Sequence, residues 1–222
     1  HIFCPSPFVA DSVADTGIDR SKIVLAPYGA SRTLTQDQIR STVVSQRKPD
    51  EALRVGFVGT EGVRKGLRYL VEAVDRATFP IELHVFGLAG FDLPQYANQL
   101  KKVTFWGHLP KDMLLHQVSQ LHAGCLPSLY EGSALGVFDF LSCGVPVVVT
   151  PNAGTVITHD EQGLIVPVRD SDALLQAFEQ FHGDEERRQQ MGHAGLSVAG
   201  VYTWDRYRQC LYERLEPLLL KD

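Results

Sequence analysis

The segment "LRVGFVGTEGVRKGLRYLVEAV", residues 53–74, contains a strand, a glycine-rich loop and a helix in direct succession. Its first six residues, 53–58, form a nearly continuous apolar run, which is typical of a strand that is buried on both faces. The residues after the loop have the i, i+3, i+4, i+7 spacing of an amphipathic helix: Leu67, Leu70, Val71 and Val74. The segment therefore predicts one repeating unit of a parallel α/β sheet.

The same alternation continues along the chain. Further strands are predicted at residues 81–86, 103–107, 123–127 and 145–149, and helical patterns follow at Met113 to Leu121, around Leu174 to Phe181, at 185–195 and from Trp204 onward. Apolar strands separated by helices imply a parallel sheet covered on both faces, which is a Rossmann-like α/β architecture. The segment 150–167, after the last of these strands, is expected to be a plain connector.

Residues 1–48 differ from the rest of the chain. "HIFCPS" predicts a strand, the next stretch a helix that ends at Gly17, and "KIVLAPYG" a second strand, followed by a polar linker. One β-α-β unit cannot bury its own faces. We therefore expect residues 1–48 to be the tail of a preceding domain with its linker, 49–203 to form the main Rossmann-like domain, and 204–222 to be a terminal helix.

Composition excludes several classes of function. The net charge is −5 and the 21 Lys and Arg residues are spread along the sequence, which argues against nucleic-acid binding. The four cysteines have neither metal-ligand nor disulfide-framework spacing, so we expect no metal site and a reducing, cytoplasmic compartment. No apolar run approaches the roughly 20 residues of a membrane span.

In open parallel sheets, ligands bind where the carboxyl ends of strands lead into helices, and the loop at residues 58–66 is such a place. Its glycines allow a ligand to approach the backbone closely. Arg64 and Lys65 place two cations at a helix start, which is electrostatically unfavourable unless an anion binds there. A solvated turn explains the same residues, so the loop alone leaves both interpretations open.

A second loop and helix lie in "PSLYEGSALGVFDFLSCGVP", residues 127–146. We predict a helix over about residues 134–143 with Ser133 as its N-cap. Glu131 precedes this helix, whereas Asp139 lies inside it among apolar neighbours. Because a buried carboxylate needs hydrogen-bond partners, Asp139 is a candidate functional residue.

Taken together, these motifs resemble those of the retaining GT-B glycosyltransferases called family 4. "EGSALGVFDFLSCGVPVV" resembles the family's E-x7-E segment and the strand after it, and "FVGTEGVRKGLRYLVEAV" resembles its donor-phosphate loop. "VTFWGHLPKDMLLHQVSQLHAGCLPSLYEG" is similar to the run between them, and "IFCPSPFVADSVADTGIDRSKIVLAPYGAS" to the stretch that closes the acceptor domain. The resemblance covers almost the whole chain and implies the C-terminal, donor-binding half of such an enzyme.

The resemblance implies roles for individual residues. Lys65, aided by Arg64, would neutralise the donor diphosphate, and Glu131 would bind hydroxyls of the donor sugar. Backbone N–H groups near Ser133, Ala134 and Leu135 would face the phosphates. The remaining donor-binding positions would be Gly59, Thr60, Gly62 and Asp139, the last accepting both ribose hydroxyls. No metal or other cofactor is implied.

Two positions depart from the family pattern. The second acid is Asp139 in place of Glu, which shortens the side chain by one methylene. Thr60 stands where the family commonly has Arg, which leaves Arg64 as the substitute.

The implied function is transfer of a sugar from a nucleoside diphosphate sugar to an acceptor, with retention of configuration. The partners would be that donor and the chain's own N-terminal acceptor domain, toward which the helix 204–222 would pack. This chain alone would bind donor without turnover. A degenerate, non-catalytic nucleotide-sugar-binding module and a GT-B-shaped nucleotide-sugar epimerase remain alternatives. Contact with the cytoplasmic face of a membrane through the acceptor domain, and self-association of an exposed apolar face, stay open.

Overall fold

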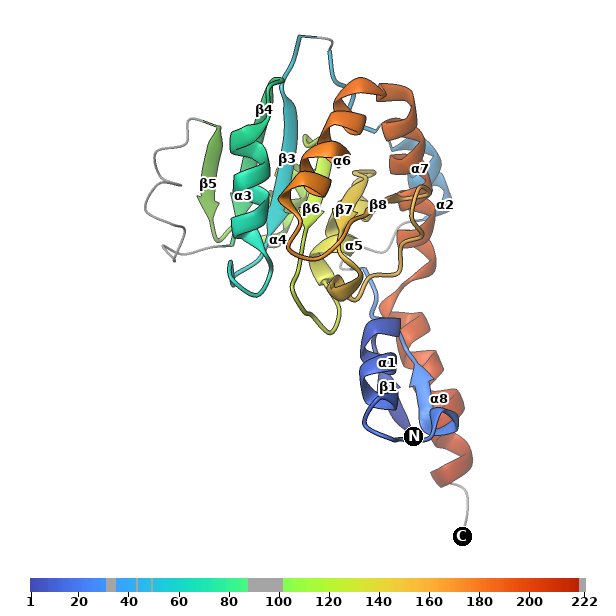
Figure 1. The fold of residues 1–222 in the computed structure, drawn as a ribbon. Coiled ribbons are helices and arrows are strands. Elements are labelled where there is room, and N and C mark those ends of the chain that lie inside the picture. The colour runs from blue at the N-terminus through green and yellow to red at the C-terminus, as the bar shows by residue number, and fades with distance from the viewer. Residues whose placement is uncertain (31–34, 43, 49, 88–101, 220–222) are drawn as a thin grey trace.

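The computed structural model describes residues 1–30, 35–42, 44–48, 50–87 and 102–219. A six-stranded sheet in the order β5-β4-β3-β6-β7-β8 forms its centre, and every neighbouring pair of strands is parallel (Figure 1). The strands are β3 (Leu53–Val58), β4 (Ile81–Phe86), β5 (Val103–Gly107), β6 (Ala123–Leu126), β7 (Val147–Val149) and β8 (Gly163–Ile165). The predicted parallel α/β architecture is confirmed.

Helices cover both faces of this sheet (Figure 1). On one face, α3 (Leu67–Arg76) packs against α6 (Ser171–Gly183). On the other face, α5 (Leu135–Ser142) packs between α4 (Lys111–Val118) and α7 (Glu185–Val201). The four apolar residues that predicted α3 are all buried in the core.

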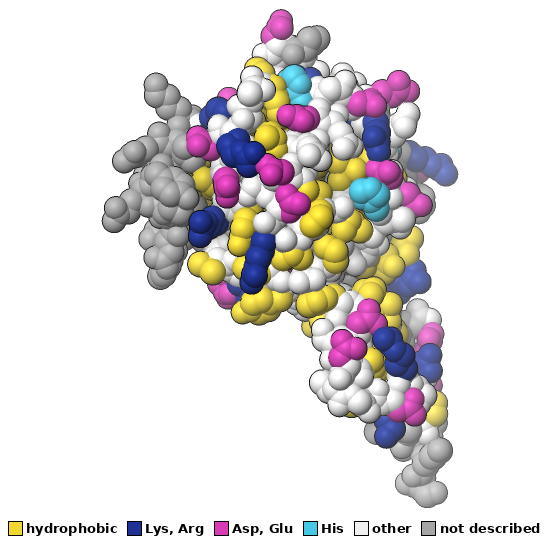
Figure 2. Space-filling view, viewed as in Figure 1, with side chains coloured by type: hydrophobic (Ala, Val, Ile, Leu, Met, Phe, Trp, Pro, Cys, Tyr) yellow, Lys and Arg dark blue, Asp and Glu magenta, His cyan; other side chains and the backbone are white. Residues whose placement is uncertain are grey.

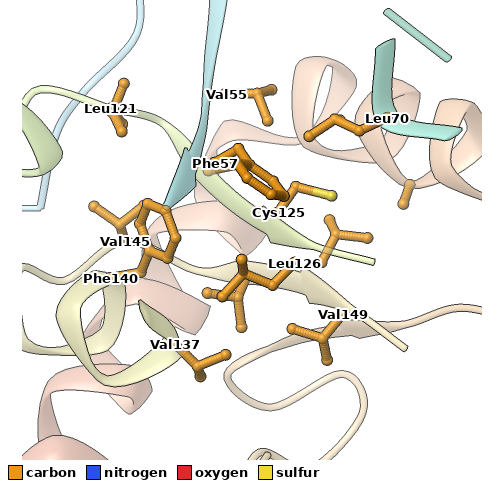
Figure 3. Close-up of a cluster of buried hydrophobic side chains, with 14 of the residues drawn as sticks. Val55, Phe57, Leu70, Leu121, Cys125, Leu126, Val137, Phe140, Val145 and Val149 are labelled. Carbon is orange, nitrogen blue, oxygen red and sulfur yellow. The ribbon is translucent and has the colours of Figure 1, made fainter. Parts of the chain in front are cut away.

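Two glycines of adjacent central strands allow α5 to approach the sheet closely. Gly56 of β3 pairs with Gly124 of β6, and the ring of Phe140 from α5 lies over both. A Cβ at Gly124 would come within 2.4 Å of that ring. Figure 3 shows Phe140 in a cluster of buried side chains that also includes Val137 of α5 and Leu126 of β6. This packing fixes where α5 begins relative to the ends of the strands.

The predicted strands at 53–58, 81–86 and 103–107 are confirmed residue for residue. The other two are shorter than predicted, because β6 ends at Leu126 and β7 begins at Val147. The segment 150–167 is not a plain connector, since it contains η3 (Pro151–Ala153) and the edge strand β8. With only three residues, β8 is too short to show the alternation or the apolar run that identifies a strand.

A separate β-α-β unit precedes the large sheet, as predicted. It consists of β1 (Ile2–Cys4), α1 (Pro7–Ala14) and β2 (Ile23–Leu25), with the short turn η1 (Arg20–Lys22) before the second strand. The long helix α8 (Trp204–Leu219) runs beside this unit (Figure 1).

Aromatic side chains join the β-α-β unit to α8. Tyr28, just after β2, stacks on Trp204 with ring centroids 5.6 Å apart and meets Tyr207 edge-on. A groove of about 480 Å³ also lies between these elements, lined among others by Leu25 and Glu213. The division of the chain at residues 48/49 and 203/204 stays a prediction.

The linker contains a helix that the sequence did not indicate, α2 (Gln36–Ser41). A capping box formed by Thr35 and Gln38 closes its first turn. The helix is polar and six residues long, so it has no apolar stripe that could predict it. Among the described residues, no helix is long and apolar enough to cross a membrane.

Buried Arg188 of α7 ties the linker to the main sheet. Its side chain is fully buried and donates to the carbonyl oxygen of Ser45 at 2.7 Å and to that of His122 at 2.9 Å. The guanidinium also pairs with Glu185 at 2.5 Å. One side chain therefore satisfies acceptors from the linker, from α7 and from the residue before β6.

His122 is also fully buried and has a structural position. Burial, followed by the charges of Arg54 and Arg188, lowers the pKa of His122 to about 3. The neutral ring accepts a hydrogen bond at Nδ1 from the backbone N–H of Arg54 at 3.0 Å. His122 therefore serves the packing of the sheet, as a neutral acceptor for the backbone of β3.

Arg188 provides the first test of the fold. We expect Arg188→Leu to lower the free energy of unfolding by about 3–5 kcal/mol, because Glu185 would lose its cation and the carbonyls of Ser45 and His122 would lose this donor. Urea denaturation followed by circular dichroism measures this change.

The adjacent Arg187 is the matched control. It pairs with Asp160, and both side chains are more than 40% exposed, at 41% and 51%. Exposed pairs contribute at most about 1 kcal/mol, so Arg187→Leu should have a small effect. Equal losses in the two variants would contradict the role assigned to Arg188.

Candidate functional site

The candidate site lies at the carboxyl ends of β3 and β6. The chain goes from β3 outward to β4 and β5, and then returns to place β6 on the other side of β3. Such a reversal of strand order leaves a crevice between the two loops that follow the adjacent strands, and ligands bind there. The two loops are residues 59–66 and 127–134, both singled out by the sequence.

Lys65 and Glu131, one from each loop, form an ion pair across this crevice. Lys65 Nζ lies 2.7 Å from Glu131 Oε1 and 2.9 Å from Oε2, and the two side chains are only 10% and 11% exposed. Ser128 Oγ donates to Glu131 Oε2 at 3.1 Å. The structure thus brings together two residues predicted to be functional and adds Ser128, which the sequence analysis missed.

Arg64 lies at the rim of the same crevice. Its Nε donates to Glu61 at 2.6 Å, and this hydrogen bond raises the pKa of Arg64. Its Nη1 is 4.0 Å from Glu131 Oε1, and the guanidinium lies over the exposed ring of Tyr130. Arg64 is therefore a second cation beside Glu131, more exposed than Lys65.

The predicted glycine-rich loop wraps around the Lys65 side chain. Gly59 approaches it so closely that a Cβ there would lie 2.4 Å from Lys65 Cδ. The carbonyl of Gly62 accepts the backbone N–H of Leu67 at the start of α3, and Thr60 is exposed. Gly59 and Gly62 shape the loop, whereas Thr60 is open to solvent.

The N-terminus of α5 differs from the prediction at one residue. Ala134, not Ser133, is the N-cap, and no side chain caps the helix. The N–H of Ala134 donates to the carbonyl of Ala153 at 3.0 Å, so this amide is engaged within the protein. In the part of the chain that the structure describes, the N–H groups of Leu135 and Gly136 have no acceptor. Uncapped amides at the positive end of a helix form a ready binding site for an anion.

Asp139 is buried, as its apolar neighbours suggested. Its side chain is 5% exposed, and Lys111 Nζ lies 2.5 Å from its Oδ1. The sequence predicted that this carboxylate needs a partner but did not identify Lys111. The predicted helix began at Met113, whereas α4 begins at Lys111, so the sequence did not place this cation at a helix start.

Two lysine–carboxylate pairs therefore involve the segment that contains α5. Lys65 follows β3 and pairs with Glu131 just before α5, whereas Lys111 follows β5 and pairs with Asp139 inside α5. Each lysine begins or precedes a helix at the carboxyl edge of the sheet. The arrangement can hold an anion at the open amides and accept hydroxyl groups at the carboxylates.

The β-α-β unit also contacts this site. Ser6 is fully buried, and its Oγ donates to the carbonyl of Gly132 at 2.7 Å. From the other side, the N–H of Glu131 donates to the carbonyl of Asn152 at 2.8 Å. The loop that carries Glu131 is thus held between two elements. On the face shown in Figure 2, hydrophobic side chains gather where the two parts of the molecule meet, and charges of both signs are interspersed above them.

A doubly wound sheet with an anion-binding crevice at its switch point is characteristic of nucleotide-binding α/β proteins. Residues 52–184 match the family described as "Glycosyl transferases group 1". The chain belongs to this family.

Curated relatives agree with this assignment. The chain is 26% identical over 211 residues to an O-antigen chain mannosyltransferase B of Escherichia coli, covering 84% of this chain and 55% of that protein. It is 25% identical over 218 residues to a D-inositol 3-phosphate glycosyltransferase of Paenarthrobacter aurescens, covering 90% and 53%. The chain spans about half the length of these relatives.

Solved structures show the same fold. A sucrose-phosphate synthase from Thermosynechococcus elongatus matches with a TM-score of 0.80 and 21% identity, over 99% of this chain and 58% of that one. HepE of Anabaena in complex with UDP matches with a TM-score of 0.79 and 16% identity, over 97% and 63%. The fold is therefore that of the GT-B glycosyltransferases.

Gly66 tests the loop geometry independently of any ligand. It has φ +72°, and a Cβ would lie 2.1 Å from the carbonyl oxygen of Pro127. We expect Gly66→Ala to lower the free energy of unfolding by about 2 kcal/mol or more, because both the backbone conformation and the contact oppose a side chain. Gly183→Ala is the control, since no atom lies within 4 Å of the added Cβ, and it should change stability by less than about 1 kcal/mol. Urea denaturation that gives similar values for both variants would contradict this account of the loop.

Proposed function

We propose that this chain is the donor-binding, C-terminal half of a retaining family 4 glycosyltransferase, which moves a sugar from a nucleoside diphosphate sugar to an acceptor. The observation that carries the proposal is the uncapped start of α5, with the Lys65–Glu131 pair just before the helix and the Lys111–Asp139 pair within it. Membership of the family supports the reaction class.

The donor diphosphate would bind at the N-terminus of α5. The N–H groups of Leu135 and Gly136, which have no acceptor among the described residues, would donate to its oxygens, and the helix dipole favours an anion there. Lys65 has three N–H donors, so it can contact a phosphate oxygen and keep its bond to Glu131. These groups, with Arg64, would stabilise the charge that develops on the departing nucleoside diphosphate.

The two carboxylates would select the sugars on either side of the diphosphate. A carboxylate accepts hydrogen bonds from hydroxyl groups and repels phosphate. Glu131 would therefore accept hydroxyls of the transferred sugar, and Asp139 would accept those of the ribose. Thr60 contributes no charge in place of the family's common Arg, which leaves Arg64 and Lys65 as the cations of this loop.

Structures of similar fold support a nucleotide-sugar ligand. HepE of Anabaena matches this chain in complexes described as containing UDP, UDP and glucose, and UDP-glucose. The named relatives act on different substrates. The identities of the base, the sugar and the acceptor are therefore not assigned to this chain from them. The proposed chemistry needs no metal, since Lys65, Arg64 and the helix start supply the positive charge.

Turnover would require an acceptor domain beyond this chain. We propose that residues 1–48 and the helix from 204 onward belong with that domain, and that residues 49–203 hold the donor. The hydrogen bond from Ser6 to the carbonyl of Gly132 supports a close contact between residues 1–48 and the loop that carries Glu131. The protein would work in the cytoplasm, with any membrane contact made by the acceptor side.

Lys65 tests the proposed donor site. By isothermal titration calorimetry, at least one of UDP, GDP and ADP should bind the 222-residue chain with a micromolar to millimolar Kd. Lys65→Met should weaken this binding by about tenfold or more, because a charge-assisted hydrogen bond to phosphate is lost. Exposed Lys22, in η1, provides the control variant Lys22→Met, which should bind as the unaltered chain does. No binding of any of the three nucleotides, or equal binding by Lys65→Met, would refute the proposal.

A further inference from the structure

Lys111 occupies a position that the diphosphate site does not explain. It is the first residue of α4, where a cation opposes the helix dipole, and the preceding N-cap, Pro110, offers no side-chain bond. Its side chain is 43% exposed, yet its ammonium lies 2.5 Å from a carboxylate that is 5% exposed. A partly exposed lysine is therefore paired with a buried carboxylate.

A contribution to the stability of the fold is a weak explanation for the presence of this ion pair. Replacing an ion pair on a buried site by apolar residues is often neutral or stabilising. Every residue of α5 from Gly136 to Ser142 is buried, so an apolar residue would suit position 139. Lys111 also begins α4 at the carboxyl edge of the sheet, which is the edge where ligands bind in such folds, and Asp139 lies within α5.

The combination of an acid and an ammonium suits a hydroxyl group better than either does alone. Each hydroxyl can donate one hydrogen bond and also accept, whereas a carboxylate only accepts and an ammonium only donates. Lys111 Nζ carries three N–H donors, of which one serves Asp139 Oδ1. A hydroxyl beside this pair could therefore donate to the carboxylate and accept from the ammonium.

We propose that Lys111 and Asp139 recognise the ribose diol of the donor as one unit. Asp139 accepts the hydroxyl protons, and Lys111 orients the carboxylate and donates to a ribose oxygen. The ammonium thereby compensates for the shorter reach of Asp relative to Glu. This inference rests on the proposed donor site and assigns Lys111 as a positioning and specificity residue.

The test compares ribose with 2′-deoxyribose nucleotides by calorimetry. UDP, GDP and ADP are titrated into the 222-residue chain, followed by the 2′-deoxy counterpart of the one that binds most tightly. We expect the chain to prefer the ribose form by about tenfold, because the deoxy form leaves the polar pair without its partner. In Lys111→Met the preference should fall to about threefold or less, and Lys111→Arg, which keeps a cation, should restore most of it.

A double-mutant cycle with Asp139→Asn shows whether the two residues act as a unit. Asp139→Asn should reduce the preference as Lys111→Met does, and the double variant should show little further loss. Independent, additive losses would overturn the proposal, as would an unchanged preference in Lys111→Met. Thermal unfolding checks that each variant folds, and if Lys111→Met does not fold, the same ratio in Lys111→Gln decides.

The same titrations separate this inference from the proposed function. If none of UDP, GDP and ADP binds the unaltered chain, the donor site itself is wrong and this inference fails with it. If binding is present and Lys65→Met weakens it, but the Lys111 variants keep the ribose preference, then only the role of Lys111 is refuted.

Discussion

The reversal of strand order between β3 and β6 is the constraint on which the rest of the structure depends. It forces the loops after these two adjacent strands to leave the sheet at the same edge and in opposite directions. Gly56 and Gly124 then admit Phe140 against the strands, which sets how closely α5 approaches that edge. The open end of α5 is consequently presented in the crevice by packing that involves no charged group.

The charged groups near α5 form two pairs, each between a lysine near the start of another helix and a carboxylate from the segment that contains α5. Lys65 and Lys111 lie near the starts of α3 and α4, where the helix dipoles disfavour cations. Each is matched by a carboxylate from the segment that contains α5, Glu131 before the helix and Asp139 within it. The pairs keep four charged groups in place at one edge while the amides of α5 carry the remaining positive potential. The candidate site is thus held in place by interactions within the chain itself.

The sequence predicted those features that have long or repeated local patterns. Strands of five or six apolar residues and the helix α3 were found at their positions, whereas β8 and the polar helix α2 are too short to produce a periodic signal. The prediction of Ser133 as N-cap was wrong, since Ala134 is the N-cap of α5. A residue type that is preferred at N-caps does not determine at which residue the helix begins. The need of Asp139 for a partner followed from burial alone. Its partner Lys111 is 28 positions away, and only the tertiary fold brings the two together.

The most direct test of the account is a ¹H–¹⁵N NMR titration of the 222-residue chain with UDP, GDP and ADP. The account predicts that the backbone amide signals of Leu135 and Gly136 shift most for the nucleotide that binds, since these N–H groups would donate to the diphosphate. Signals that shift instead around the groove between β2 and α8, with Leu135 and Gly136 unchanged, would contradict it.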